Sequence, residues 1–84
     1  MARHPVRTPQ QLALVLQGYR RQAGLTQKEA ATKVGMLPKT ISLIENDADS
    51  SSIASLFKLL SALDLEIVLQ AKGSSTATPD GDEW

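Results

Sequence analysis

The sequence contains no cysteine and one histidine, His4, among its 84 residues. Without cysteine the chain can form neither a disulfide nor a thiolate metal site, and a lone histidine beside proline and arginine is better explained as a solvated side chain than as a ligand. The sequence also lacks a catalytic triad set, a phosphate-binding loop and a metal-ligand cluster. We therefore expect no enzyme activity, no cofactor and no bound metal.

Long hydrophobic runs are missing as well. The apolar stretches are far shorter than the ~20 residues that a membrane-spanning helix needs. The residues before Leu12 contain no apolar stretch, so they do not have the pattern of a signal peptide. These features predict a soluble, cytoplasmic protein. A chain of this length is one domain with a small core, and dimerisation is a common way for such a domain to bury more apolar surface.

Neither sign of charge dominates, because nine Lys and Arg balance nine Asp and Glu. The charges are distributed unevenly, however. Residues 73–84 carry three acids and no base, so residues 1–72 hold nine bases against six acids, a net charge of +3. A mildly basic body with a short acidic tail is compatible with DNA binding but does not by itself indicate it.

Four segments have the start signals and periodicity of helices. The first begins after Thr8 and ends near Gly24, and the second begins at a capping box at Thr26 and ends at Gly35. The third begins near Pro38 and is followed by a loop. The fourth begins after residues 50–52, and its apolar face is wider than a solvent-exposed helix needs. Part of that face is therefore expected to contact another subunit.

Three segments are not helical in this interpretation. Residues 1–7 are expected to form a flexible arm, and residues 73–84 a disordered acidic tail that ends at Trp84, the only tryptophan. Residues 66–72 are β-branched at the centre and charged at the ends, which predicts one strand. This strand has no partner in the chain, so we expect it to pair with the same strand of a second copy. The expected dimer contacts are Leu60, Leu63, Ile67, Val68 and Leu69.

The segment from Thr26 to Asn46 has the pattern of a helix-turn-helix. Ala30 is small enough for two helices to approach closely, and Gly35 allows the positive φ of the turn. Spacing alone leaves an ordinary αα-hairpin equally possible. The coincidence of these residue types at these intervals favours DNA binding. The predicted seam between the two helices consists of Val34, Ile41 and Ile44.

Two motifs carry a family resemblance: R-x-x-x-G-L-T-Q-x-E from Arg20 to Glu29, and I-S-x-I-E from Ile41 to Glu45. Residues 10–63 resemble the Cro/C1-type (Xre) helix-turn-helix family. The resemblance implies a mostly α, lambda-repressor-like helix-turn-helix bundle of four to five helices that binds operator DNA as a homodimer. It also implies a partly buried ion pair between Arg20 and Glu45, so that Arg20 is not a DNA contact.

A narrower resemblance covers residues 8–72 together with the polar tail. The chain is similar to the antitoxins of type II toxin-antitoxin modules whose toxin is a HipA-like Ser/Thr kinase. This resemblance implies a nucleoid-associated repressor that autorepresses its operon and neutralises the kinase. It also implies that Trp84 docks on the toxin and that a cellular protease attacks the tail. Two alternatives remain open: an Xre-family phage-type or metabolic repressor without a toxin, and an interaction module that has lost DNA binding.

The resemblance also assigns positions that face DNA. The residues expected in the major groove are Leu37, Pro38, Lys39, Thr40, Ser42 and Leu43. Lys39 is the expected base reader because lysine can donate to guanine O6 and N7. Pro38 offers only apolar contact, such as with a thymine methyl, and is equally well explained as the first residue of a helix. Leu43 either packs within the protein or contacts bases. The expected phosphate contacts are Gln27, Lys28 and Asn46, with Arg21 and Lys33 weaker.

Overall fold

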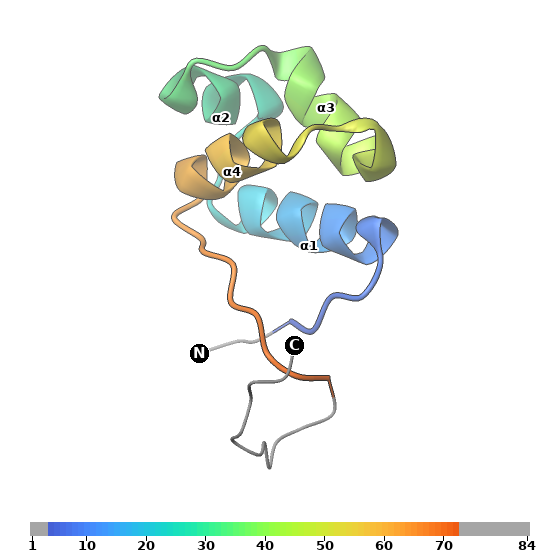
Figure 1. Cartoon of the computed structure of the whole chain (residues 1–84). Coiled ribbons are helices and arrows are strands. Elements are labelled where there is room, and N and C mark those ends of the chain that lie inside the picture. Colours follow the sequence, from blue (N-terminus) through green and yellow to red (C-terminus); the bar gives the residue numbers. More distant parts are fainter. Residues whose placement is uncertain (1–3, 73–84) are drawn as a thin grey trace.

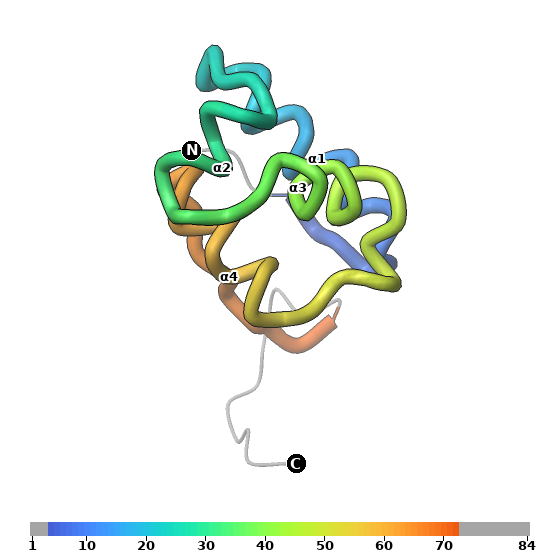
Figure 2. The backbone as a smooth tube through the Cα atoms, turned by 90° about the horizontal axis from the view of Figure 1, so that it is seen from above, coloured from blue at the N-terminus to red at the C-terminus, as the bar shows by residue number. Residues whose placement is uncertain are grey.

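The computed structural model of the chain describes residues 4–72. This range folds into four α-helices and a short 3₁₀ helix, in the order α1 (Pro9–Gln22), α2 (Gln27–Val34), α3 (Pro38–Asn46), η1 (Ala48–Ser50) and α4 (Ile53–Ala62). Helix α2 packs against α3 and α4, and α3 also packs against α1. In Figure 1, α2 and α3 form the upper part of the bundle, and they face the viewer in Figure 2. The mostly helical, helix-turn-helix fold expected from the sequence is confirmed.

Local capping explains where three of these four helices begin. The hydroxyls of Thr8, Thr26 and Ser52 accept hydrogen bonds from backbone N–H groups three residues later, at 3.0–3.1 Å. The capping box at Thr26 is complete, because its own N–H donates to Glu29 Oε1 at 2.8 Å. Helix α3 is the exception. Its N-cap is Leu37, which makes no side-chain capping bond, and Pro38 occupies the first helical position.

The turn between α2 and α3 depends on Gly35. This residue ends α2 in the left-handed region, with φ 69° and ψ 33°, where a side chain would add strain. Across the turn, Ala30 is fully buried, so α2 can approach its neighbours closely. Ile41 and Ile44 of the predicted seam are also fully buried, whereas Val34 is only half-buried. The seam therefore lies mainly on the α3 side.

Side chains from all four helices form the hydrophobic core. The buried cluster consists of Leu16, Ala30, Ala31, Ile41, Ile44, Leu59 and Leu60. Leu60 is only 5% exposed within this single chain, because the turn of α4 directs it into the cluster. A side chain already buried in its own core offers little surface to a second subunit. The contact predicted between Leu60 and a second subunit would use only this small exposed part, and it stays a prediction. Leu63 is half-buried and also packs against this cluster.

The strand predicted at residues 66–72 is not formed in the single chain. Residues 65–71 have neither helical nor strand structure, and no strand occurs elsewhere in the described range. A strand needs a neighbouring strand to form its ladder of backbone hydrogen bonds, and residues 4–72 contain no second strand. The side chains of Ile67, Val68 and Leu69 are all exposed. In Figure 1 this segment runs away from the end of α4, on the α1 side of the bundle.

The N-terminal segment makes contacts with α1. The ring of His4 lies edge-on to that of Tyr19, with centroids 5.4 Å apart, and the Arg7 N–H donates to Gln11 Oε1 at 2.6 Å. Residues 4–7 of the predicted arm thus have ordered neighbours. The acidic tail and Trp84 lie outside the described residues.

Candidate nucleic-acid interface

The ion pair implied by the family resemblance is present at the centre of the helix-turn-helix. Arg20 Nε lies 2.6 Å from Glu45 Oε2, and Arg20 Nη2 donates to Glu45 Oε1 at 3.0 Å. The side chains are 9% and 0% exposed respectively. These hydrogen bonds raise the pKa of the Arg20 guanidinium; its burial opposes the shift and the negative charge of Glu45 adds to it. The guanidinium therefore remains charged wherever the protein is folded at ordinary pH.

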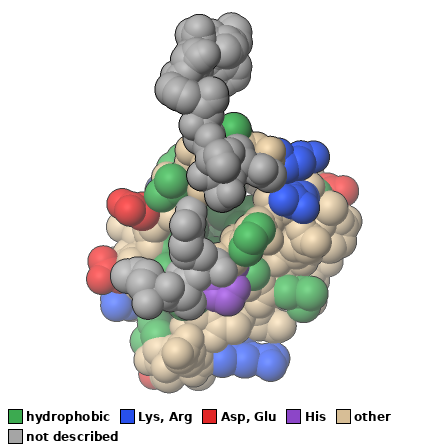
Figure 3. All heavy atoms as spheres, turned by 90° about the horizontal axis from the view of Figure 1, so that it is seen from below, with side chains coloured by type: hydrophobic (Ala, Val, Ile, Leu, Met, Phe, Trp, Pro, Cys, Tyr) green, Lys and Arg blue, Asp and Glu red, His purple; other side chains and the backbone are tan. Residues whose placement is uncertain are grey.

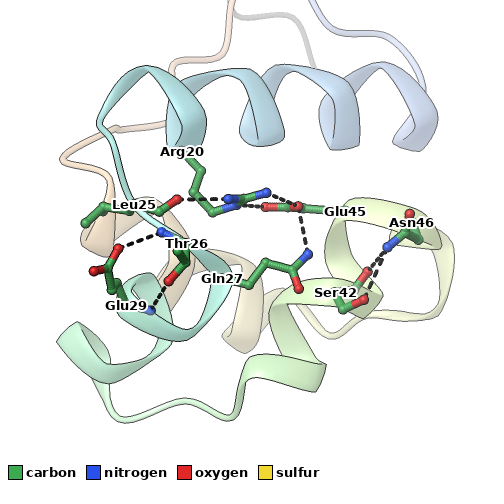
Figure 4. A network of polar contacts seen from close by, with 8 residues as sticks. All are labelled: Arg20, Leu25, Thr26, Gln27, Glu29, Ser42, Glu45 and Asn46. Carbon is green, nitrogen blue, oxygen red and sulfur yellow. Dashed lines mark hydrogen bonds and ion pairs between the residues drawn. The ribbon is translucent and has the colours of Figure 1, made fainter.

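Two further contacts extend this ion pair into a network (Figure 4). Arg20 Nη1 donates to the carbonyl oxygen of Leu25 at 2.8 Å, which fixes the loop that leads into α2. Gln27 Nε2 donates to Glu45 Oε1 at 3.1 Å. The network thus joins α1, the start of α2 and the last turn of α3. It fixes how α3 is oriented relative to the rest of the bundle.

The start of α2 can still meet a phosphate, although the contact differs from the expected one. Gln27 donates one side-chain N–H to Glu45, and the other N–H stays available. Within residues 4–72, the backbone N–H groups of Gln27 and Lys28 have no hydrogen-bond partner, as expected for the first residues of a helix. Such groups attract anions. The Lys28 side chain is exposed beside them.

The N-terminus and outer side of α3 carry the residues expected to face the major groove. Leu37 is 58% exposed and Leu43 is 39% exposed. Pro38 and Lys39 are also exposed, while Thr40 and Ser42 are half-buried. The exposure of Leu43 means that packing within the chain uses only part of its surface. The outer side of α3 therefore presents an ammonium group, two hydroxyls and three apolar side chains.

Asn46 has a neighbour that the sequence reasoning missed. Its Nδ2 donates to the Ser42 carbonyl oxygen at 2.8 Å and to Ser42 Oγ at 3.2 Å. The two residues are four apart on a helix, a spacing at which side chains meet, and this spacing was the available signal. Figure 4 shows the pair apart from the Arg20–Glu45 network. The phosphate contact expected of Asn46 thus competes with an internal role.

The groups available at this site are those that recognise nucleic acid. Residues 4–72 contain no cluster of three or more His, Cys, Asp or Glu that could hold a metal ion. No helix in this range has the length and apolarity needed to cross a membrane. An exposed helix that follows a short turn and carries donors, acceptors and apolar groups has the form that enters a major groove.

Comparisons with known proteins agree with this geometry. A helix-turn-helix family model, HTH_3, matches residues 16–70. The chain is 40% identical to Antitoxin HipB of Escherichia coli O6:H1 (strain CFT073) over 87 residues, covering 100% of this chain and 93% of the relative. It is 36% identical to Antitoxin HipB of Escherichia coli (strain K12), covering 100% of this chain and 99% of the relative.

Solved structures give the same result. A complex of a HipB variant with an O2 20mer superposes with a TM-score of 0.82 at 35% identity, covering 84% of this chain and 99% of that chain. A HipA-HipB-O2-O3 complex matches with a TM-score of 0.79 at 37% identity, covering 81% of this chain and 96% of that chain. The chain therefore belongs to the helix-turn-helix family and, within it, to the HipB antitoxins.

Proposed function

We propose that the chain is a sequence-specific DNA-binding repressor and the antitoxin of a type II toxin-antitoxin module. It binds its operator as a homodimer, autorepresses its operon and neutralises a HipA-like Ser/Thr kinase. The observation that carries this proposal is similarity over the whole chain to HipB, together with solved structures of HipB with DNA and of HipA with HipB and DNA. The proposal includes no catalytic activity and a cytoplasmic, nucleoid-associated location.

The exposed side of α3 supports the DNA-binding half of the proposal. Lys39 donates to a base edge, Thr40 and Ser42 contact bases or phosphates, and the apolar groups of Leu37, Pro38 and Leu43 meet apolar base surface. Backbone N–H groups at the start of α2 hold a phosphate, with Lys28 beside them. Gln27 and Asn46 are further phosphate contacts in this proposal, and Arg21 and Lys33 are weaker ones. In a two-fold dimer the two α3 helices would enter successive major grooves, roughly 34 Å apart.

The segment after α4 supports the homodimer. Ile67, Val68 and Leu69 are three consecutive apolar residues with exposed side chains in the single chain, an arrangement that is costly in water. Hydrophobic side chains are also visible on the face seen in Figure 3, opposite the α2–α3 face. Pairing of this segment with the same residues of a second copy would bury these apolar side chains. Leu63 lies next to this segment and joins the interface.

The tail supports the kinase-binding half of the proposal. Trp84 is the last of the twelve residues 73–84, most of which are polar, and it lies beyond the described part of the chain. Tryptophan is enriched among residues that dominate binding energy at interfaces. A flexible tether of this length has a root-mean-square reach of ~20 Å. The same polar segment is the part of the chain that a cellular protease would attack.

Co-purification tests the proposal most broadly. The full chain would be co-expressed with the product of the neighbouring gene, with an affinity tag on that product, and captured from solution. A HipA-like kinase in that position, held together with the chain, is the expected result. The chain shortened by Trp84 alone is the matched variant, and we expect it to be captured less while its DNA affinity is unchanged. Operator binding without capture of any kinase would favour the repressor without a toxin instead.

A further inference from the structure

The chemistry of the Ser42–Asn46 pair fixes the direction of its hydrogen bonds. A carbonyl oxygen can only accept, so the Asn46 atom 2.8 Å from the Ser42 carbonyl oxygen must be the amide nitrogen. The same nitrogen lies 3.2 Å from Ser42 Oγ. Since an amide nitrogen can only donate, Ser42 Oγ accepts in this contact. The Asn46 side chain therefore cannot be turned around without losing the shorter bond.

The proton of the Ser42 hydroxyl is consequently left for another acceptor. Serine and threonine in helices commonly donate this proton to the carbonyl four residues earlier, and Thr32 does so in α2, to the Lys28 carbonyl at 2.9 Å. Ser42 donates no such bond to the Pro38 carbonyl, and among residues 4–72 its proton has no other acceptor. Ser42 lies on α3 and is half-buried as a residue.

We propose that Asn46 is a positioning residue that makes the Ser42 hydroxyl a hydrogen-bond donor toward DNA. The inference rests on the proposed DNA-binding function and assigns Asn46 a role through Ser42 in place of a phosphate contact of its own. In the major groove the acceptors that fit are purine N7, guanine O6 and thymine O4, whereas adenine N6 and cytosine N4 are donors and do not fit. A phosphate oxygen has the same acceptor chemistry. The pair thus directs the Ser42 proton toward an acceptor at the contacted position.

A double-mutant cycle tests this mechanism, because residues that act as a unit are not additive. The full chain and its Ser42→Ala, Asn46→Ala and doubly substituted forms would be titrated against operator DNA selected from a random library by the wild-type chain. We expect Ser42→Ala to weaken binding about three- to tenfold, as for one lost hydrogen bond. Asn46→Ala should weaken binding in the wild-type background and have no further effect when Ser42 is alanine. Ser42→Thr, which keeps the hydroxyl, should retain the affinity.

The two sources of the acceptor are separated by repeating the selection with Asn46→Ala. If the acceptor is a base edge, one operator position loses its preference for acceptor-bearing bases. If it is a phosphate, affinity falls equally on all sequences and the preference is unchanged. Helix content and the unfolding midpoint of each variant would be compared with the wild type, and both substitutions lie at solvent-accessible positions of α3.

Additive losses from the two substitutions would overturn the inference and return Asn46 to a direct contact. So would an Asn46→Ala protein that binds as tightly as the wild type. A wild-type chain that selects no sequence over scrambled DNA would contradict the proposed function itself. That result differs from the two that contradict only the positioning role of Asn46.

Discussion

Arg20 and Glu45 form a two-point ion pair that joins α1 to the last turn of α3, with Nε–Oε2 at 2.6 Å and Nη2–Oε1 at 3.0 Å. Glu45 directly follows Ile44, which is fully buried, and directly precedes Asn46, which is exposed. The pair therefore fixes the rotation of α3 about its own axis. This rotation decides which side chains of α3 face outward.

We expect Glu45→Ala to destabilise the fold by ~3–5 kcal/mol, because it leaves the Arg20 guanidinium buried without its counter-charge. Urea unfolding followed by circular dichroism measures the loss. The matched control replaces both partners with apolar side chains, Arg20→Met together with Glu45→Leu. It should recover most of the stability, because no uncompensated charge remains. A loss below about 1 kcal/mol for the single substitution, the range of an exposed pair, would contradict the structural role.

Lys39 is expected to contribute to sequence discrimination rather than to general affinity. Lys39→Ala should weaken operator binding by ~1–3 kcal/mol with little effect on binding to scrambled DNA. Competition gel shifts with both DNAs measure the difference. Lys58→Ala, at an exposed position of α4, is the matched control and should leave the discrimination unchanged. Equal losses on both DNAs for Lys39→Ala would mean a phosphate contact instead.

Leu37 is the N-cap of α3, but its apolar side chain cannot form the capping hydrogen bond that Ser, Thr, Asp or Asn forms at this position. Leu37→Asn supplies the missing cap and should stabilise the fold by ~1 kcal/mol. It should also weaken operator binding, because an exposed apolar group at the interface is lost. Thermal unfolding and DNA titration on the same preparation test both effects. A variant that is more stable and binds equally well would show that Leu37 lies outside the interface.

The dimer prediction has an unusually close internal control. Val68, in the proposed subunit interface, is 69% exposed in the single chain, and Leu14 on α1 is 68% exposed. Val68→Asp should shift the protein from dimer to monomer in sedimentation velocity at micromolar concentration, because a buried unpaired carboxylate is costly. Leu14→Asp should remain dimeric. If both variants keep the dimer, the interface lies elsewhere.

Features that depend on short stretches of sequence were predictable. The starts of α1, α2 and α4 follow from Thr8, Thr26 and Ser52, each with a backbone N–H in reach. Gly35 ends α2 for an equally local reason, since only glycine adopts its positive φ without strain. The exposure of Lys39 likewise follows from the helical period once the buried Ile41 and Ile44 are placed.

Features that depend on contacts between distant segments were not predictable from the residues alone. The bond from Gln27 to Glu45 needs α2 and α3 packed in their final orientation. The burial of Leu60 depends on which part of a broad apolar face turns inward. The strand predicted at 66–72 is not formed in the described range, and a strand requires hydrogen bonds from outside itself. The loop expected after α3 contains the single 3₁₀ turn of η1.

Specific DNA binding is the claim on which the account rests, and one titration tests it most directly. The full chain would be titrated by fluorescence anisotropy against DNA from upstream of its own gene and against a scrambled duplex of equal length, over a series of salt concentrations. We predict binding to the upstream DNA at least about 10³-fold tighter at physiological salt. We also predict a linear fall of log affinity with log salt on both DNAs. Equal affinity for the two duplexes at every salt concentration would contradict the account.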